Sequence, residues 1–107
     1  MNNINYQATK FQGQPVVTLN VEGEHKQYSA QFFKDWEADA AIEMLQTLEE
    51  AVDANEKIML TCDEKKVLIE VGDDKKSYMF EFNEDNAAEA YRLAGTFIRL
   101  TNSPVEA

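Results

Sequence analysis

The stretch "LIEVGDDKKSYMFEF", residues 68–82, reads as a strand, a charged turn and a second strand, and the same pattern stands fifty residues earlier as "TLNVEGEHKQYSAQF", residues 18–32. Apolar and polar residues alternate on both sides of each turn, which is the period-two pattern of half-buried strands. The alternating residues are Val17, Leu19, Val21, Tyr28, Ala30 and Phe32 in the first stretch, and Val67, Ile69, Val71, Tyr78, Phe80 and Phe82 in the second. The chain therefore contains one type of hairpin twice.

The similarity extends beyond the hairpins, because residues 16–51 align with residues 66–101 without a gap at an offset of 50. Any two amphipathic hairpin-and-helix units look alike, but equal loop lengths and matching Tyr and Phe positions favour duplication. A further strand candidate precedes each hairpin, at residues 4–11 and 57–62. The sequence predicts the order βββα-βββα, with repeats at about residues 4–54 and 57–102.

The two charged turns fix the expected pairing of the strands. Four-residue loops at 22–25 and 72–75 place Leu19 opposite Tyr28, and Ile69 opposite Tyr78. The apolar residues then share one side of each meander, where helices can cover them. We expect an α+β fold of antiparallel sheet or sheets, with two helices packed on one face, in a single domain of residues 1–107.

The first helix is expected over residues 35–54, with Asp35 as its cap. At 100° per residue its apolar side chains gather on one side and its carboxylates on the other. The second helix is expected over about residues 84–101, capped by Asn83 or Asp85, and its apolar stripe covers half of the circumference. Gly95 inside this helix indicates either a close approach by a neighbouring element or a merely tolerated glycine.

The charge of the chain opposes the binding of one broad class of ligand, nucleic acids. Twenty acidic residues against ten basic ones give a formal charge of −10. Attraction to a phosphate backbone depends on Lys and Arg clusters, so general nucleic-acid affinity is not expected. There is no apolar stretch long enough to span a membrane, and the first ten residues lack the apolar core of a signal peptide. We expect a cytoplasmic protein without membrane contact.

The residues that usually carry catalysis are scarce. His25 is the one histidine, on a turn, and Cys62 is the one cysteine, in an apolar alternation that predicts a small buried hydrophobe. There is no Gly-rich phosphate loop, no zinc ligand set and no EF-hand spacing in the carboxylate pairs 63–64 and 73–74. The sequence predicts a non-enzymatic protein with no catalytic residue, metal or cofactor.

The acidic side chains support the leading hypothesis, a small binding protein that masks the basic surface of a partner protein. Immunity proteins and phage-encoded inhibitors of nucleic-acid enzymes share this character, and the acidic helix face suggests a DNA mimic as one form of it. A solvated outer face is the alternative, since surface helices are often acidic. The acidic residues expected at the partner interface are Asp39, Glu43, Glu50, Asp53, Glu22, Glu24, Asp73 and Asp74.

A second hypothesis rests on apolar residues at strand positions that should face solvent. Leu68 and Met79 stand opposite each other in the expected ladder, where the first half has Thr18 and Ser29, and Met59 lies on the preceding strand. Outward strand positions usually stay polar unless something covers them. Met59, Leu68 and Met79 therefore predict an apolar contact surface, and with it a homodimeric chaperone or scaffold.

The repeated sheet-plus-helix order resembles the architecture of the whirly and PUR-type single-stranded nucleic-acid binders, whose units carry one more strand. This resemblance implies a third, weaker function, in which Phe11 and Phe33 stack bases on an open sheet. The sequence departs from these families in lacking their motifs and in its acidic charge.

Overall fold

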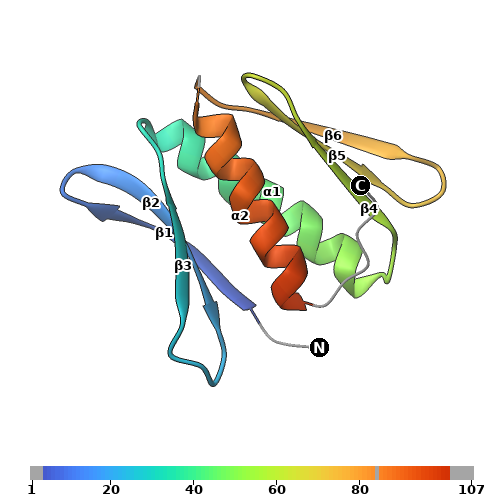
Figure 1. The fold of residues 1–107 in the computed structure, drawn as a ribbon, viewed down its shortest axis with the longest axis horizontal. Helices are drawn as coiled ribbons and strands as arrows, with labels where there is room; N and C mark the ends of the chain where they lie inside the picture. The colour runs from blue at the N-terminus through green and yellow to red at the C-terminus, as the bar shows by residue number, and fades with distance from the viewer. Residues whose placement is uncertain (1–3, 84, 102–107) are drawn as a thin grey trace.

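The protein folds into two three-stranded antiparallel sheets on opposite sides of a pair of helices, as the computed structural model of residues 4–83 and 85–101 shows (Figure 1). The strand order is β1-β2-β3 in the first sheet and β4-β5-β6 in the second. The predicted α+β fold and βββα-βββα order are confirmed. The elements are β1 (Ile4–Phe11), β2 (Gln14–Val21), β3 (Gln27–Gln31), α1 (Asp35–Asp53), β4 (Ile58–Cys62), β5 (Lys66–Val71), β6 (Lys76–Glu81) and α2 (Asn86–Thr101).

Each sheet packs one of its faces against the helix pair. α1 contacts β1, β2 and β6, while α2 contacts β1, β3, β4 and β5, and the helices also contact each other. Because each helix touches both sheets, α2 can bury the wide apolar stripe that one sheet alone would leave exposed. The Cα atoms extend over 41 × 34 × 17 Å. In the view down the short axis, α2 lies in front of α1, so their outer sides belong to opposite broad faces (Figure 1).

The expected registers are present, with Leu19 opposite Tyr28 and Ile69 opposite Tyr78. The alternating Val, Leu and Ile side chains of β2 and β5 all point into the core and are buried. The rings of Phe32 and Phe82 stack with centroids 5.7 Å apart at 22°. These two residues occupy equivalent positions in the two repeats, so the halves meet along a pseudo-two-fold relation.

The gapless alignment holds for the strands but is wrong for the helices. Phe32 N donates to Pro15 O and Phe82 N donates to Lys65 O, two bonds that are related by an offset of 50. In the helices the matching offset is 49. Seven of the eight buried residues of α1 then match a buried residue of α2, pairing Glu37 with Asn86, Ala38 with Ala87, Ala41 with Ala90, Met44 with Leu93, Leu45 with Ala94, Leu48 with Phe97 and Val52 with Thr101.

The chain takes one residue fewer from Phe82 to Asn86 than from the equivalent Phe32 to Glu37, and this shift changes which helix residues are equivalent. Asp85, in the shorter of these two paths, takes a left-handed φ of 73°. The bond from Thr47 Oγ1 to the Glu43 carbonyl recurs as the bond from Thr96 Oγ1 to the Arg92 carbonyl. Glu43 of α1 therefore corresponds to Arg92 of α2.

The expected cap of the first helix is wrong by one residue. Lys34 is the N-cap residue of α1, with extended φ and ψ of −125° and 150°, and Asp35 is the first helical residue. Glu37 caps the helix instead, because its Oε1 accepts hydrogen bonds from the backbone N–H groups of Phe33 and Lys34. Asp35 forms an exposed ion pair with Lys10, at 2.7 Å.

Two further expectations about single residues are corrected. Cys62 is exposed, although the alternation predicted burial, because it is the last residue of β4. Gly95 makes no close approach, since a Cβ built there would meet one neighbouring atom within 4 Å, Arg99 Nη1 at 3.9 Å. The glycine is tolerated in α2 and not required there.

Candidate functional site

Four carboxylates from three segments converge on one open cleft between the end of α1 and the β5–β6 hairpin. The cleft has a volume of about 660 Å³. Its carboxylates are Glu50 on α1, Glu56 in the α1–β4 connection, and Asp73 and Asp74 on the hairpin turn. One lysine also lines the cleft. The remaining lining residues are Thr47, Ala51, Ala54, Val71, Gly72, Lys76 and Tyr78.

The cleft therefore unites three of the eight acidic residues that the sequence predicted, Glu50, Asp73 and Asp74. Asp39, Glu43 and Asp53 lie on α1 outside the cleft and are exposed. Glu22 and Glu24 are exposed on the β2–β3 turn of the other half. The predicted set thus divides into a cleft, an adjoining helix face and a separate turn.

Two ion pairs are present in the described part of the chain, Lys10–Asp35 and Arg92–Glu89. Within residues 4–83 and 85–101, the carboxylates of the cleft form no ion pair, and neither do those of α1 apart from Asp35. Carboxylates that gather in excess of nearby positive charges raise the free energy of the fold and create a negative potential in front of the surface. Among these same residues, no group of three or more His, Cys, Asp and Glu side chains is placed to hold a metal ion.

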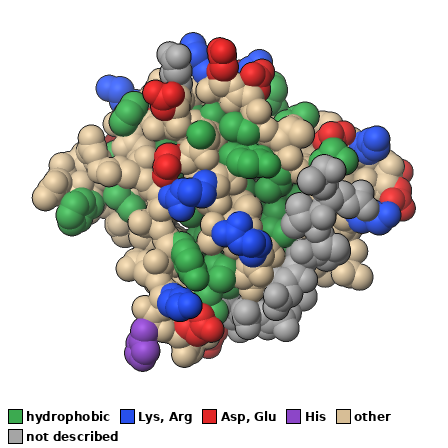
Figure 2. Space-filling view, in the orientation of Figure 1, with side chains coloured by type: hydrophobic (Ala, Val, Ile, Leu, Met, Phe, Trp, Pro, Cys, Tyr) green, Lys and Arg blue, Asp and Glu red, His purple; other side chains and the backbone are tan. Residues whose placement is uncertain are grey.

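The opposite broad face, along α2, differs in charge. Figure 2 shows this face with Lys and Arg side chains over its middle and most of its carboxylates toward the margins. The exposed arginines of α2 are Arg92 and Arg99, and their equivalents on α1 are Glu43 and Glu50. The two helices thus present opposite charges at equivalent positions.

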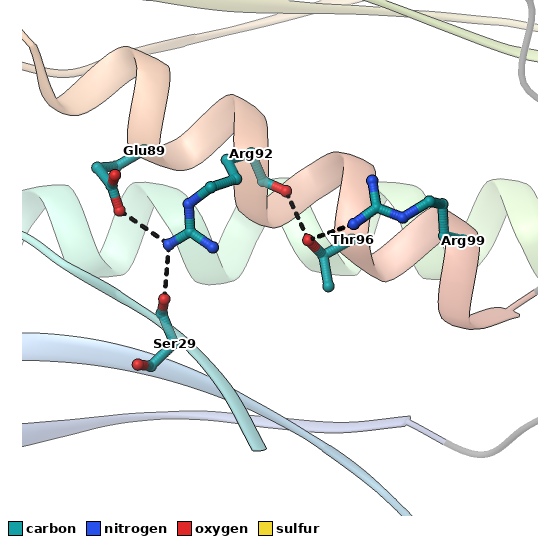
Figure 3. A network of polar contacts seen from close by, with 5 residues as sticks. All are labelled: Ser29, Glu89, Arg92, Thr96 and Arg99. Atoms are coloured by element: carbon teal, nitrogen blue, oxygen red, sulfur yellow. Dashed lines mark hydrogen bonds and ion pairs between the residues drawn. The ribbon is translucent and has the colours of Figure 1, made fainter. Parts of the chain in front are cut away.

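Arg92 ties α2 to the edge of the first sheet (Figure 3). Its Nη2 donates to the carbonyl oxygen of Ser29 on β3 at 2.7 Å and to Oε2 of Glu89 at 2.9 Å. Arg99 donates from its Nη2 to Thr96 Oγ1 at 3.2 Å, on the same side of the helix. A guanidinium of the chain itself therefore fills the groove between α2 and β3.

Between α1 and β6 there is no arginine at the equivalent position, although Lys76 of β6 lines the nearby cleft. The residue equivalent to Arg92 is Glu43, and the residue equivalent to Ser29 is Met79, since the strands keep the offset of 50. A carboxylate stands where the other half has a guanidinium. The acidic cleft lies between the same two elements, one turn farther along α1.

The predicted apolar residues lie on the outer face of the second sheet. Met79 is 56% exposed and stands opposite Leu68 in the ladder, as expected. Leu68 and Met59 are half-buried. The exposed apolar surface is therefore centred on Met79, with Leu68 on the neighbouring strand β5 and Met59 one strand farther away on β4.

The titratable groups with shifted pKa values lie outside the cleft. Removal of water and the nearby Asp63 raise the pKa of the Cys62 thiol, which keeps it protonated and weakens it as a nucleophile. Burial and the hydrogen bond to Glu49 raise the pKa of Tyr6 to about 12. Both shifts follow from burial and from neighbouring carboxylates.

Three features escaped the sequence interpretation. The cleft residue Glu56 was missed because nothing local distinguishes it from other loop acids. The Arg92–Ser29 contact joins residues 63 positions apart, so no local pattern contains it. Glu37 could have been found, because a carboxylate three residues after the cap position is a known helix-start signal.

No helix within the described residues is long and apolar enough to cross a membrane.

Comparison with known proteins gives no information on the role of this chain, because it matches no family model, no curated protein and no solved structure.

Proposed function

We propose that this protein is a small, non-enzymatic binding protein that masks a basic surface on a partner protein through the acidic cleft and the outer face of α1. The convergence of Glu50, Glu56, Asp73 and Asp74 on one open cleft carries the proposal. Asp39, Glu43 and Asp53 extend the same charge along the helix. An inhibitor or immunity-type protein of the cytoplasm fits this chemistry, with a nucleic-acid enzyme as the partner class.

The acidic surface is concave, and this shape distinguishes it from an acidic helix face that is only solvated. A solvated face needs no contribution from other elements, whereas here the α1–β4 connection and the β5–β6 turn bring three more carboxylates to Glu50. Repulsion between these carboxylates destabilises the fold, and a basic partner would relieve this repulsion on binding. Such a surface steers association more strongly than it adds final affinity.

Reversal of charge at Glu43 and Glu50 tests the proposal. The variant Glu43→Lys/Glu50→Lys and the wild type are used to capture proteins from a cell lysate, and the association rate of each captured protein is then measured. A control variant adds the same four charges elsewhere, through Glu64→Lys, Gln7→Lys and Thr9→Lys, all at exposed positions.

We expect a basic partner that associates with the wild type and the control, and about tenfold or more slowly with the α1 variant at low salt. The difference should shrink as salt is added. Equal association rates for the two charge variants would reject the acidic surface as the binding site.

Self-association is a second candidate, favoured by the 56% exposure of Met79 beside Leu68 on the outer sheet face. A second copy placed face to face would cover both side chains. Light scattering at tens of micromolar checks it: a dimer that Met79→Lys converts to a monomer supports this function, and a monomeric wild type removes it.

A further inference from the structure

The edge of β6 presents an unpaired row of backbone groups next to the acidic groove. Phe82 N donates to Lys65 O at 2.8 Å, so Phe82 points its backbone bonds toward β5. Backbone groups alternate in direction along an antiparallel strand. Ser77, Met79 and Glu81 therefore direct their N–H and C=O groups away from β5, and these groups have no hydrogen-bond partner within the described residues.

The equivalent edge of the first sheet is partly closed by the chain itself. By the same alternation, Phe32 bonds toward β2 and Ser29 points its backbone groups outward. The Arg92 guanidinium donates a hydrogen bond to that outward carbonyl oxygen at 2.7 Å, and the Glu89 carboxylate accepts a second bond from the same guanidinium (Figure 3). In the first half of the molecule, a guanidinium thus provides the hydrogen bond that an outward carbonyl of the edge strand requires.

The β6 edge has the acceptors of that arrangement without its donor. Met79 corresponds to Ser29, and Glu43 replaces Arg92 on the flanking helix. A carbonyl and a carboxylate both accept hydrogen bonds, and both favour a guanidinium or ammonium group between them. One turn farther along α1, Thr47 and Glu50 line the acidic cleft together with Lys76 and Tyr78 of β6.

We propose that the β6 edge binds an extended basic segment of a partner protein as an added antiparallel strand. Residues of the segment that face α1 would be Arg or Lys, placed against Glu43, Glu50 and the ring of Tyr78. The alternate residues would be apolar and would cover Met79 and Leu68. This inference rests on the proposed function and defines the shape and sequence pattern of its partner.

A second copy of this chain fits the edge poorly. Because α1 packs beside β6, two copies paired edge to edge would place two acidic helices on the same side of one continuous sheet. The repulsion between them opposes pairing, whereas a basic segment removes it.

The first test uses synthetic heptapeptides and the full chain. The probe is acetyl-Val-Arg-Val-Arg-Val-Arg-Val-amide, and its control is the isomer in which the three arginines stand together. Calorimetry should give one site on the wild type, with affinity about tenfold higher for the alternating peptide. Equal affinity of the two isomers would show attraction by charge alone and would overturn the proposal.

Methylation of backbone nitrogens locates the edge. In an antiparallel pair, the residues opposite Met79 share its side of the sheet and exchange hydrogen bonds with it, so the valines make these bonds. N-methylation of the valines should weaken binding about tenfold, and N-methylation of the arginines should change it little. The reverse order, or no difference, contradicts strand addition.

Variants of the flanking helix give the matched control. Glu43→Arg copies the arrangement at Arg92 and should close the β6 edge, whereas Asp53→Arg makes the same change of charge on α1 away from that edge. Glu43→Arg should reduce peptide affinity at least several-fold more than Asp53→Arg does. The reciprocal variant Arg92→Glu should open the β3 edge and raise the stoichiometry from one peptide to two.

These outcomes separate the inference from the proposed function. If reversal of Glu43 and Glu50 slows the basic partner but Glu43→Arg and Asp53→Arg weaken the peptide equally, the acidic surface stands and the strand mechanism fails. If neither pair of variants changes binding, both fail. Thermal unfolding of each variant, with wild-type cooperativity, shows that the fold is intact.

Discussion

Asn86 donates a hydrogen bond from Nδ2 to Oε2 of Glu37 at 2.8 Å, although the two residues stand 49 positions apart and occupy equivalent places in the two helices. The bond crosses the pseudo-two-fold relation between the halves. Glu37 is fully buried, and its carboxylate also accepts from the N–H groups of Phe33, Lys34 and Asn83. A single side chain thus joins the starts of both helices.

Replacement of Glu37 should lower stability sharply. In Glu37→Gln one side-chain oxygen becomes an NH₂ group that cannot accept hydrogen bonds, so two of the four donors lose their acceptor. We expect a loss of about 3 kcal/mol in the free energy of unfolding at neutral pH, measured by urea denaturation. The exposed Glu64→Gln is the control and should have no measurable effect, and a comparably small effect at Glu37 would contradict the structural role.

The pH dependence of that difference has a defined sign. Burial raises the pKa of Glu37, but the hydrogen bonds from Asn86, Asn83 and Lys34 outweigh it and lower the pKa below its ordinary value of 4.5. A lowered pKa means that the carboxylate stabilises the fold fully above its unfolded pKa and loses this effect as the pH falls through the folded pKa. The difference in the free energy of unfolding between wild type and Glu37→Gln should be constant near neutral pH and should become smaller below about pH 4.5. A gap that widens in acid would be inconsistent with this.

Two glycines should respond in opposite directions to alanine. Gly95 lies in a helix with open space around it, so Gly95→Ala should stabilise the protein by about 0.5–1 kcal/mol. Gly23 also has open space but takes a φ of 86° on its turn, so Gly23→Ala should destabilise it by about 1–2 kcal/mol. Differential scanning calorimetry of both variants checks the pair. Equal shifts in Tm would refute the assignment of the difference to backbone conformation.

Thr18 is a buried hydroxyl without a partner in the described part of the chain. The residue is 6% exposed on β2, and its Oγ1 forms no hydrogen bond there. Thr18→Val keeps the shape and removes the unsatisfied group, so it should stabilise the fold by about 1 kcal/mol in chemical denaturation. Thr9→Val, at an exposed position on the adjacent strand, should have little effect. A destabilised Thr18→Val protein would indicate that the hydroxyl has a partner.

Tyr6 should titrate late and should influence stability at alkaline pH. Its burial and its 2.9 Å bond to Glu49 raise its pKa to about 12 from an ordinary 10.0. The raised pKa means that its stabilising effect is present below pH 10.0 and is lost as the pH approaches 12. Difference absorbance between wild type and Tyr6→Phe isolates this phenol, and Glu49→Gln should shift its titration to lower pH. A phenol that ionises near pH 10.0 would contradict the bond.

Much of the fold follows from local patterns in the sequence. The period-two alternation of Val67, Ile69 and Val71 and the charged turn after them specify both the pairing partner and the buried face, and the structure has both. The end of the alternation carries less information, which is why Cys62 was misjudged: the pattern does not say where the covering helices stop. The shift of α2 by one residue was hidden because Asp35 and Asp85 align by chance in the gapless comparison.

The candidate site was predicted only in part, for reasons of distance along the chain. Exposed acids such as Glu50 and Asp73 can be assigned to the surface from their position on a helix or turn, but their meeting in one cleft depends on how α1 crosses the second sheet. Glu43 and Arg92 are equivalent residues only at the helix offset of 49, which the sequence does not reveal. Tertiary placement, and not residue chemistry, was the missing information.

The guanidinium of Arg92 on α2, which binds the Ser29 carbonyl of β3, also serves as an internal reference for ligand design. Its position relative to the strand gives the coordinates at which a synthetic arginine mimic should sit on the sister strand, before any natural ligand is identified. A compound built from that template needs only the symmetry of the fold, and its success or failure would measure how closely the two βββα repeats superimpose.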